Sequence, residues 1–249
     1  MQHRRVVATT EAVADLRQAV LGELLGQGHR HLARARQRAG PALGQEIGHA
    51  QLVVVCHGLL DVGVEKKEEM PVLISAVSAQ LTLGLDSFSL DYFRDIYVLK
   101  HDYHYGYYSL PFMGHVDSSG IYLSWDNFLQ GIHRAADNSN VGLHEMAHAL
   151  AYVNFITKTE QDKHFSTEFR NYSEVARPIF MEMQKGRKTL LGEYAATNYH
   201  EFWAVSVEMF FENPFRFKYE LPDLYAAMVK LLKQDPYELI VNRRADAVA

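Results

Sequence analysis

Hydrophobic and polar positions along the chain follow two different periods, which predicts a fold with both strands and helices. Residues 95–100 ("DIYVLK") and 120–125 ("GIYLSW") combine β-branched and aromatic residues between turn residues, a pattern typical of strands. The segment between them is rich in Tyr, His and Gly and predicts an ordered polar loop or hairpin. Apolar residues with helix-compatible spacing predict helices over residues 11–25, 45–60, 66–83, 126–131, 139–155, 160–185, 198–212 and 221–234. The expected class is therefore α+β, a small mixed sheet packed among mostly α-helices.

Composition and charge narrow the partners that we expect. The 249 residues, 48% of them hydrophobic, are enough for one sizeable core, and the formal net charge of −5 provides no global basic field for nucleic acid. Residues 1–40 differ from the rest because they hold seven Arg, no Lys and three acidic residues. Such a segment could touch nucleic acid or anionic lipid, but a solvated helix face explains the charge more simply. We expect residues 1–45 to be a basic helical or linker segment that binds no nucleic acid directly.

Cysteine usage and apolar runs bear on the compartment. The one cysteine, Cys56, excludes an intramolecular disulfide and fits a reducing compartment. Its setting in "LVVVCHGLL" predicts a small buried hydrophobic residue rather than a nucleophile. The first residues contain no apolar segment of the secretory kind, and no uninterrupted apolar run approaches about 18 residues. We therefore expect a cytoplasmic protein with no membrane partner.

The segment "VGLHEMAHAL" (141–150) places two imidazoles and a carboxylate in an otherwise apolar helix. On an α-helix His144 and His148 lie about 40° apart on one face, one turn apart at a rise of about 6 Å. Two imidazoles so placed can reach one zinc ion at about 2.0–2.1 Å, and Glu145 projects beside them, able to take a proton from a metal-bound water. The alternative is a chance string on a partly exposed helix. Because the flanking residues are apolar, these polar groups need partners, which favours a bound cation.

A catalytic zinc normally has three protein ligands, so a third ligand is needed downstream. Glu201 opens "HEFWAVSVEMFF", a segment too apolar to face water, whereas most other downstream carboxylates have polar neighbours. Glu208 follows seven residues later on the same helix face, where it could accept the second N–H of a ligand imidazole. Two alternatives stay open. Asn198 and Glu201 also resemble a capping box, and His200 is a weaker candidate ligand.

Three segments together resemble one family of enzymes. The strings "NVGLHEMAHAL", "GEYAATNYHEFWAVSVEMFFENP" and "LPDLYAAMVKLLKQDP" resemble the Mlc titration factor A family of zinc peptidases, as does "YLSWDNFLQG" upstream. The similarity runs over residues 81–236, and it implies a zincin-like catalytic domain over residues 46–249. One departure concerns the residues after the second His. The family often continues with Lys-Leu-Asp, whereas Ala149, Leu150 and Ala151 stand here.

The resemblance implies a function and a set of site residues. His144, His148 and Glu201 would bind one zinc ion per chain, with Glu145 as the general base. Tyr194 matches a tyrosine that is thought to bind the oxyanion in this family and in the similar lethal-factor-type proteases, and a phenol can do this beside a metal. The implied reaction is hydrolysis of a peptide or protein substrate by a gluzincin-type metallopeptidase, with a lean toward aminopeptidase activity.

Other functions remain open at the level of the sequence. The family name also implies a regulatory protein that binds and sequesters a transcriptional repressor, with weak or incidental peptidase activity. A second metal site could be formed by His101, His104 and His115, although their irregular spacing among tyrosines favours a polar loop near the cleft. We expect residues 120–125 to form the sheet edge beside that cleft and to pair with an extended substrate.

Overall fold

The computed structural model describes residues 6–8, 52–54, 58–62, 69–85, 90, 92–105, 109–134, 138–157 and 162–246. The chain divides into two compact units. The first unit comprises Met1–Gln80 and Ser89–Ala149, and the second comprises Leu81–Phe88 and Leu150–Ala249. The predicted α+β class is confirmed, because strands gather in the first unit and the second contains helices in its described part.

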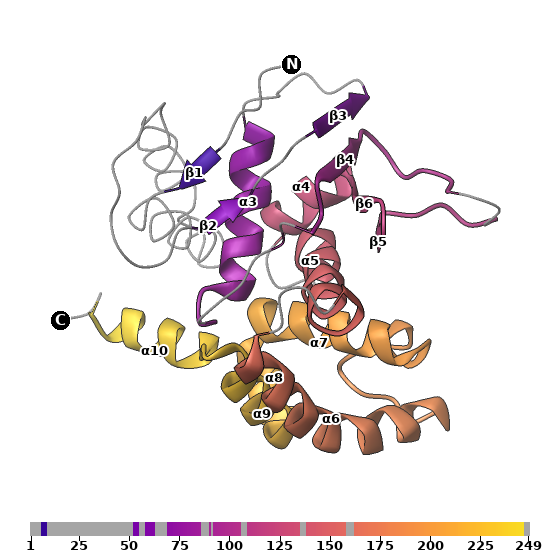
Figure 1. Ribbon diagram of the computed structural model, residues 1–249. Coiled ribbons are helices and arrows are strands. Elements are labelled where there is room, and N and C mark those ends of the chain that lie inside the picture. The colour runs from indigo at the N-terminus through magenta and orange to yellow at the C-terminus, as the bar shows by residue number, and fades with distance from the viewer. Residues whose placement is uncertain are drawn as a thin grey trace. The chain divides into compact units, whose positions relative to one another are not determined.

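A mixed four-stranded sheet organises the first unit, with strand order β3-β4-β6-β5 (Figure 1). The strands are β3 (Gly58–Val62), β4 (Asp95–Leu99), β5 (Gly114–Asp117) and β6 (Gly120–Ser124). β3, β4 and β6 are parallel, and β5 pairs antiparallel with β6. The strands predicted at residues 95–100 and 120–125 are therefore confirmed. In the described part of the polar segment between them, Tyr103 pairs with Phe112 and the next residues form β5.

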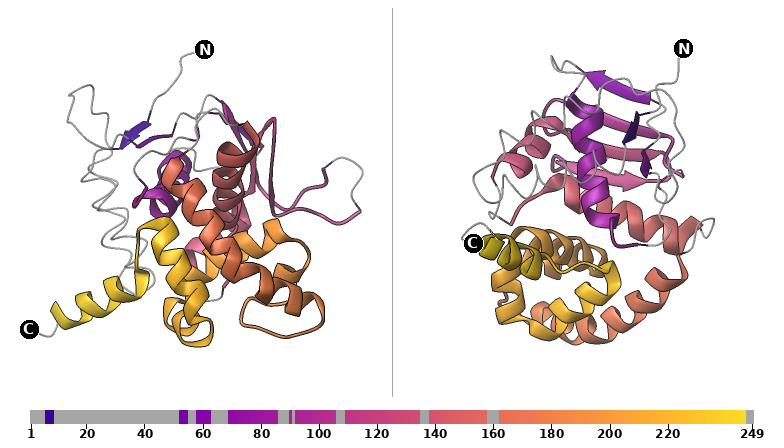
Figure 2. Two further views of the ribbon diagram at one scale, coloured as in Figure 1. Left: turned by 60° about the horizontal axis from the view of Figure 1, so that its bottom comes forward. Right: turned by 90° about the vertical axis from the view of Figure 1, so that its left-hand side faces the viewer.

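Side chains of opposite character occupy the two faces of this sheet. Ile96, Val98, Ile121 and Leu123 are buried. Helix α3 (Glu69–Thr82) crosses one face of the sheet, as the right-hand view of Figure 2 shows. The alternate positions carry half-buried tyrosines, because successive side chains of a strand point to opposite faces. The predicted helix over residues 66–83 is confirmed as α3. Helix α4 (Trp125–His133) follows β6 directly.

Two expectations for the sheet were wrong. Residues 45–60 were expected to be a buried helix, but the described part forms β2 (Leu52–Val54), which pairs with β1 (Val6–Ala8), and the start of β3. A short apolar run does not distinguish a buried strand from a helix, and here the valines and the pairing with β4 decide. The segment 120–125 is not the edge, because β6 lies between β4 and β5. The edge is β5.

Several predictions lie outside the described residues. These are the helix over 11–25, nearly all of the basic segment 1–45, and the environment of Cys56. The predicted boundary at residues 45 and 46 stays a prediction. None of the helices in the described ranges is both long enough and apolar enough to cross a membrane.

Helix α5 (Val141–Tyr152) begins in the first unit and continues into the second, where it ends in a π-helical turn, Val153–Thr157. The second unit then contains α6 (Lys163–Gln184), the 3-10 turn η2 (Tyr194–Ala196), α7 (Tyr199–Glu212), α8 (Pro214–Glu220), α9 (Pro222–Leu232) and α10 (Pro236–Asp246). The predicted helices 139–155, 160–185, 198–212 and 221–234 are confirmed. Helices α8 and α10 were not predicted, although each begins with a proline, a residue that suits the first helical position.

Aromatic packing forms the core of the second unit around α7. Every residue of this helix from Phe202 to Glu212 is buried. The ring of Trp203 meets those of Phe165 and Tyr172 edge-on, at centroid distances of 6.0 and 5.4 Å. Aromatic pairs in edge-to-face contact stabilise the fold beyond the contribution of the apolar area that they bury. A helix buried along nearly its whole length is a rigid support for the carboxylates that it carries.

Candidate metal centre

The start of α5 is held in place by Asn140, one of the cap-competent residues that precede the helix. Its Oδ1 accepts the N–H of Leu143 at 3.0 Å, and its Nδ2 donates to the carbonyl oxygen of Gly131 in α4 at 3.3 Å. Gly142 lets α4 approach, since a Cβ there would lie 2.6 Å from the ring of Phe128. The first turn of α5 is therefore fixed against α4 immediately before the two histidines.

His144 and His148 converge on that helix as predicted. Their Nε2 atoms lie 3.1 Å apart, and their rings are nearly perpendicular, with centroids 4.7 Å apart. Both side chains are half-buried. Two nitrogens bound to one tetrahedral zinc at about 2.0–2.1 Å lie about 3.3–3.4 Å apart. The observed spacing is within a few tenths of an ångström of this value, so the pair fits one cation. Without a cation it can form one N–H···N hydrogen bond.

Glu145 is buried beside the edge strand β5. Its side chain is 4% exposed, and a Cβ added at Gly114 would lie 2.6 Å from both its Cγ and its Oε1. Gly114 therefore provides the space that the carboxylate occupies. Sequence reasoning missed this contact, because nothing in the pattern of a short polar strand connects it to a helix thirty residues later.

A buried phenol, Tyr103, lies in the electrostatic range of Glu145. Burial raises the pKa of Tyr103 well above its ordinary value, and the negative charge of Glu145 raises it further. The Tyr103 hydroxyl lies 2.8 Å from Nδ1 of His115, and its backbone exchanges two hydrogen bonds with Phe112 at 3.1 and 2.8 Å. Tyr103 therefore stays protonated, and its hydroxyl connects this segment to His115 of β5.

In the second unit, Glu201 lies in the first turn of α7 and is half-buried. Asn198 caps this helix, accepting the N–H groups of His200 and Glu201 at 2.9 and 3.0 Å, which confirms the cap half of the predicted capping box. Glu208 is buried two turns later on the same helix. His200 is exposed, which makes it the poorer candidate ligand.

Tyr194 forms the first residue of the turn η2, which lies next to α7 in the sequence. Its side chain is 59% exposed, so it is not the packed aromatic that a turn at this place could have held. An exposed phenol is available to a ligand. Its role in catalysis stays a prediction.

Within the described residues, two histidines of the polar loop have partners other than a shared metal site. His101 Nδ1 lies 2.6 Å from Oδ2 of Asp126, and His115 packs between the rings of Tyr105 and Tyr122. Among the residues that the structure describes, none of His101, His104 and His115 belongs to a group of three metal-ligating side chains. The polar-loop interpretation of this segment holds for its described part.

Comparison with known proteins adds a family and one distant relative. A family model described as glucose-regulated metallo-peptidase M90 matches residues 49–233, a range that includes both the His144–His148 helix and α7. The chain is also 25% identical over 120 residues to an uncharacterized protein, slr2042, from Synechocystis sp.. That match covers 47% of this chain and 44% of the relative, so the chain spans less than half the length of the curated relative it matches.

Proposed function

Because this chain belongs to the glucose-regulated metallopeptidase family M90, we propose that it hydrolyses peptide bonds with one zinc ion held by His144, His148 and Glu201. A metal ion and peptide substrates come with membership of the family, which agrees with the resemblance in the sequence. The identity of the metal, its number per chain and the roles of individual residues are our proposal.

The observation that carries the proposal is the 3.1 Å spacing of the two Nε2 atoms on α5. Two imidazoles that converge to the edge length of a zinc tetrahedron form two thirds of a catalytic ligand set. In one class of catalytic zinc sites, a glutamate carboxylate is the third ligand beside two histidines. Glu201 is supported as the third ligand because it forms a group with His144 and His148 in which each side chain offers one possible ligand atom for a metal ion. Glu208 is proposed to accept the second N–H of a ligand imidazole, since such outer bonds orient the ring.

Zinc bound by these residues would lower the pKa of a water to about 7 and polarise the peptide carbonyl. We assign Glu145 to take the proton of that water and to deliver it to the leaving amine. Its carboxylate is almost fully buried, so it acts in a site with few competing waters. The Tyr194 phenol is assigned to donate a hydrogen bond to the carbonyl oxygen as negative charge develops there.

An extended substrate is proposed to pair with β5, which has β6 on one side and no described strand on the other. Main-chain pairing with a sheet edge is a common way to bind an extended peptide. Gly114 of this strand lies against Glu145, so a peptide on β5 would pass beside the proposed base.

The test is metal removal. Treatment with a chelator is expected to abolish hydrolysis, and one equivalent of zinc is expected to restore it, because the histidine pair alone offers no Lewis acid. Amino-acid amides and N-terminally blocked peptides, assayed side by side, test the aminopeptidase form of the proposal, which rests on resemblance to the zinc peptidases. Hydrolysis that persists at full rate in excess chelator would contradict the proposal as a whole.

Gly114→Ala is expected to lower kcat about 100-fold while the protein stays folded. The new Cβ would overlap the Glu145 side chain, and a displacement of about 1 Å in a reacting group costs about this much. Steady-state kinetics measures the effect, and circular dichroism measures the fold. The matched control is Ser118→Ala, in the exposed turn between β5 and β6, which should leave kcat unchanged. An unchanged kcat in Gly114→Ala would mean that β5 does not position Glu145.

A further inference from the structure

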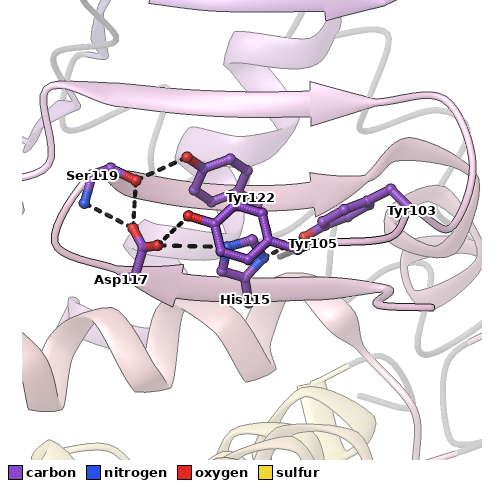
Figure 3. Close-up of polar contacts among 6 residues, drawn as sticks. All are labelled: Tyr103, Tyr105, His115, Asp117, Ser119 and Tyr122. Carbon is purple, nitrogen blue, oxygen red and sulfur yellow. Dashed lines mark hydrogen bonds and ion pairs between the residues drawn. The ribbon is translucent and has the colours of Figure 1, made fainter. Parts of the chain in front are cut away.

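The outer face of the sheet carries a cluster of aromatic and polar side chains that the proposed chemistry does not use. Figure 3 shows these residues on one face, from β5, β6, the turn between them and the segment before β5. They are Tyr103, Tyr105, His115, Asp117, Ser119 and Tyr122. We call this set the outer-face cluster. Its centre is the Asp117 carboxylate, at the end of the edge strand.

Aromatic rings lie next to this carboxylate. The imidazole of His115 stacks on Tyr122 with centroids 4.1 Å apart and planes 11° apart, and Tyr105 packs against the same imidazole at 4.1 Å. Tyr97 of β4 extends the row, stacked on Tyr122 at 4.4 Å. The row follows the register of the sheet, in which His115 pairs with Tyr122 and Tyr122 with Tyr97. Aromatic faces next to a carboxylate favour a cation.

Asp117 keeps a negative charge that no described Lys or Arg neutralises. Burial raises the pKa of its carboxyl, but hydrogen bonds from Ser119 and Tyr105 outweigh burial and hold the pKa below its ordinary value. The Nε2 atom of His115 lies 3.8 Å from Oδ2 of Asp117. Burial lowers the pKa of His115, so this imidazole is mostly neutral at neutral pH.

The two oxygens of Asp117 have different tasks. Oδ1 accepts the backbone N–H and the hydroxyl of Ser119, at 2.7 and 2.6 Å, and so closes the turn to β6. Oδ2 accepts the Tyr105 hydroxyl at 2.7 Å. A carboxylate oxygen can accept two hydrogen bonds, so Oδ2 has capacity for another donor. The side chain is 34% exposed, so a donor can approach from solvent.

Strand geometry connects this site to the proposed reaction. A peptide strand paired with β5 would place alternate side chains on the face that carries His115 and Asp117, with directly opposed Cβ atoms about 4.5–5.5 Å apart. Gly114, against Glu145, lies three residues before Asp117, or about 10 Å along a strand. A substrate side chain beside Asp117 would therefore be about three residues from the bond that is cleaved.

We propose that the outer-face cluster is a specificity subsite that binds a Lys or Arg side chain of the peptide substrate through the Asp117 carboxylate, with the ring of Tyr105 beside it. This inference rests on the proposed peptidase function and names the substrate class of that site. An ammonium or guanidinium group would donate a hydrogen bond to Oδ2 of Asp117 and lie beside the ring of Tyr105. The formal net charge of −5 also favours the approach of basic peptides.

The experiment compares peptides that are identical except for Lys, Gln or Glu at each position near the cleaved bond. The parental protein is expected to prefer Lys over Gln about tenfold in kcat/KM at one position about three residues from that bond. Asp117→Asn is expected to bring the ratio of kcat/KM between the Lys and Gln peptides to about one. Asparagine keeps an oxygen for Ser119, so it removes the charge and leaves the turn its hydrogen bonds.

Two further variants are controls for the effect of Asp117→Asn on the Lys preference. Asp126→Asn removes one charge from an exposed carboxylate of α4 and should leave the Lys preference intact. Tyr105→Phe keeps the Asp117 charge but removes the hydroxyl that occupies Oδ2, so the preference should persist. If Asp117→Asn unfolded the hairpin, Tyr105→Phe and the parental profile would still decide the question. The proposal would be overturned if no position showed a preference for Lys, or if Asp117→Asn kept the full preference.

Binding separates this proposal from the peptidase proposal. Fluorescently labelled Lys, Gln and Glu peptides are titrated into the Glu145→Gln variant, with and without Asp117→Asn, and anisotropy is measured. Tighter binding of the Lys peptide that depends on Asp117 supports the subsite, even if the parental protein cleaves no peptide. Cleavage of peptides with no charge preference in either assay would leave the peptidase standing and contradict the subsite.

Discussion

Glu145→Gln is expected to lower kcat about 1000-fold and to leave zinc content unchanged. Glutamine has the shape of glutamate but cannot accept a proton at neutral pH, and general-base catalysis contributes about 100- to 10,000-fold. The side chain is buried against Gly114, so an isosteric replacement keeps the packing that alanine would lose. Peptide hydrolysis under saturating substrate and zinc analysis of the same preparation measure the two quantities.

Glu168→Gln is a suitable control, because Glu168 is a surface carboxylate of α6 that bonds Asn171. It should retain the parental kcat. Parental turnover in Glu145→Gln would show that another group takes the proton, and the assignment of the base would be wrong. Loss of zinc in this variant would instead give Glu145 a role in holding the metal.

Glu201→Gln is expected to weaken zinc binding by more than about 100-fold and to abolish hydrolysis at ordinary zinc concentrations. Outer-shell changes alone cost about 10- to 100-fold in metal affinity, and loss of one of three ligands should cost more. The fold of α7 should survive. Asn198 caps the helix with its own side chain, and glutamine is also accepted at the third position of a capping box.

Substitutions of two other glutamates in the second unit provide comparisons for Glu201→Gln. Glu208→Gln should weaken zinc binding by about 10- to 100-fold if Glu208 orients a ligand imidazole. Glu193→Gln, at an exposed position before η2, should change nothing. Zinc binding is measured by competition with a chromophoric chelator. Parental affinity in Glu201→Gln would leave this residue with the capping role alone and would require a different third ligand.

Element types were predictable wherever local pattern decided them. Strands β4 and β6 and helices α3, α5, α6, α7 and α9 were expected close to their observed bounds. Helix α8 was not predicted because its seven residues show too little periodicity. The run containing β2 and β3 was wrongly predicted to be a helix. In that run the apolar residues have mixed spacing, and only pairing partners elsewhere in the chain make them strands.

The candidate site divides in the same way. The convergence of His144 and His148 was predictable because residues four apart on a helix are neighbours in any fold. The contact of Gly114 with Glu145 and the hydrogen bond between Tyr103 and His115 were not, because each depends on how a hairpin folds back on the sheet. The loop was expected to be polar, but its charge-bearing centre, Asp117, carried no signal of its own.

The sequence by itself determined the helix that presents two imidazoles and a carboxylate and the apolar helix that carries Glu201. Backbone geometry imposes those arrangements over one or two turns, whatever surrounds them. Only the tertiary structure decided that β5 rather than β6 is an outer strand, that a glycine makes room for Glu145, and that tyrosines from two segments lie on the same face of the sheet as Asp117. Strand order and contacts across a sheet join residues far apart in the chain, and their energies depend on every other pairing in the sheet.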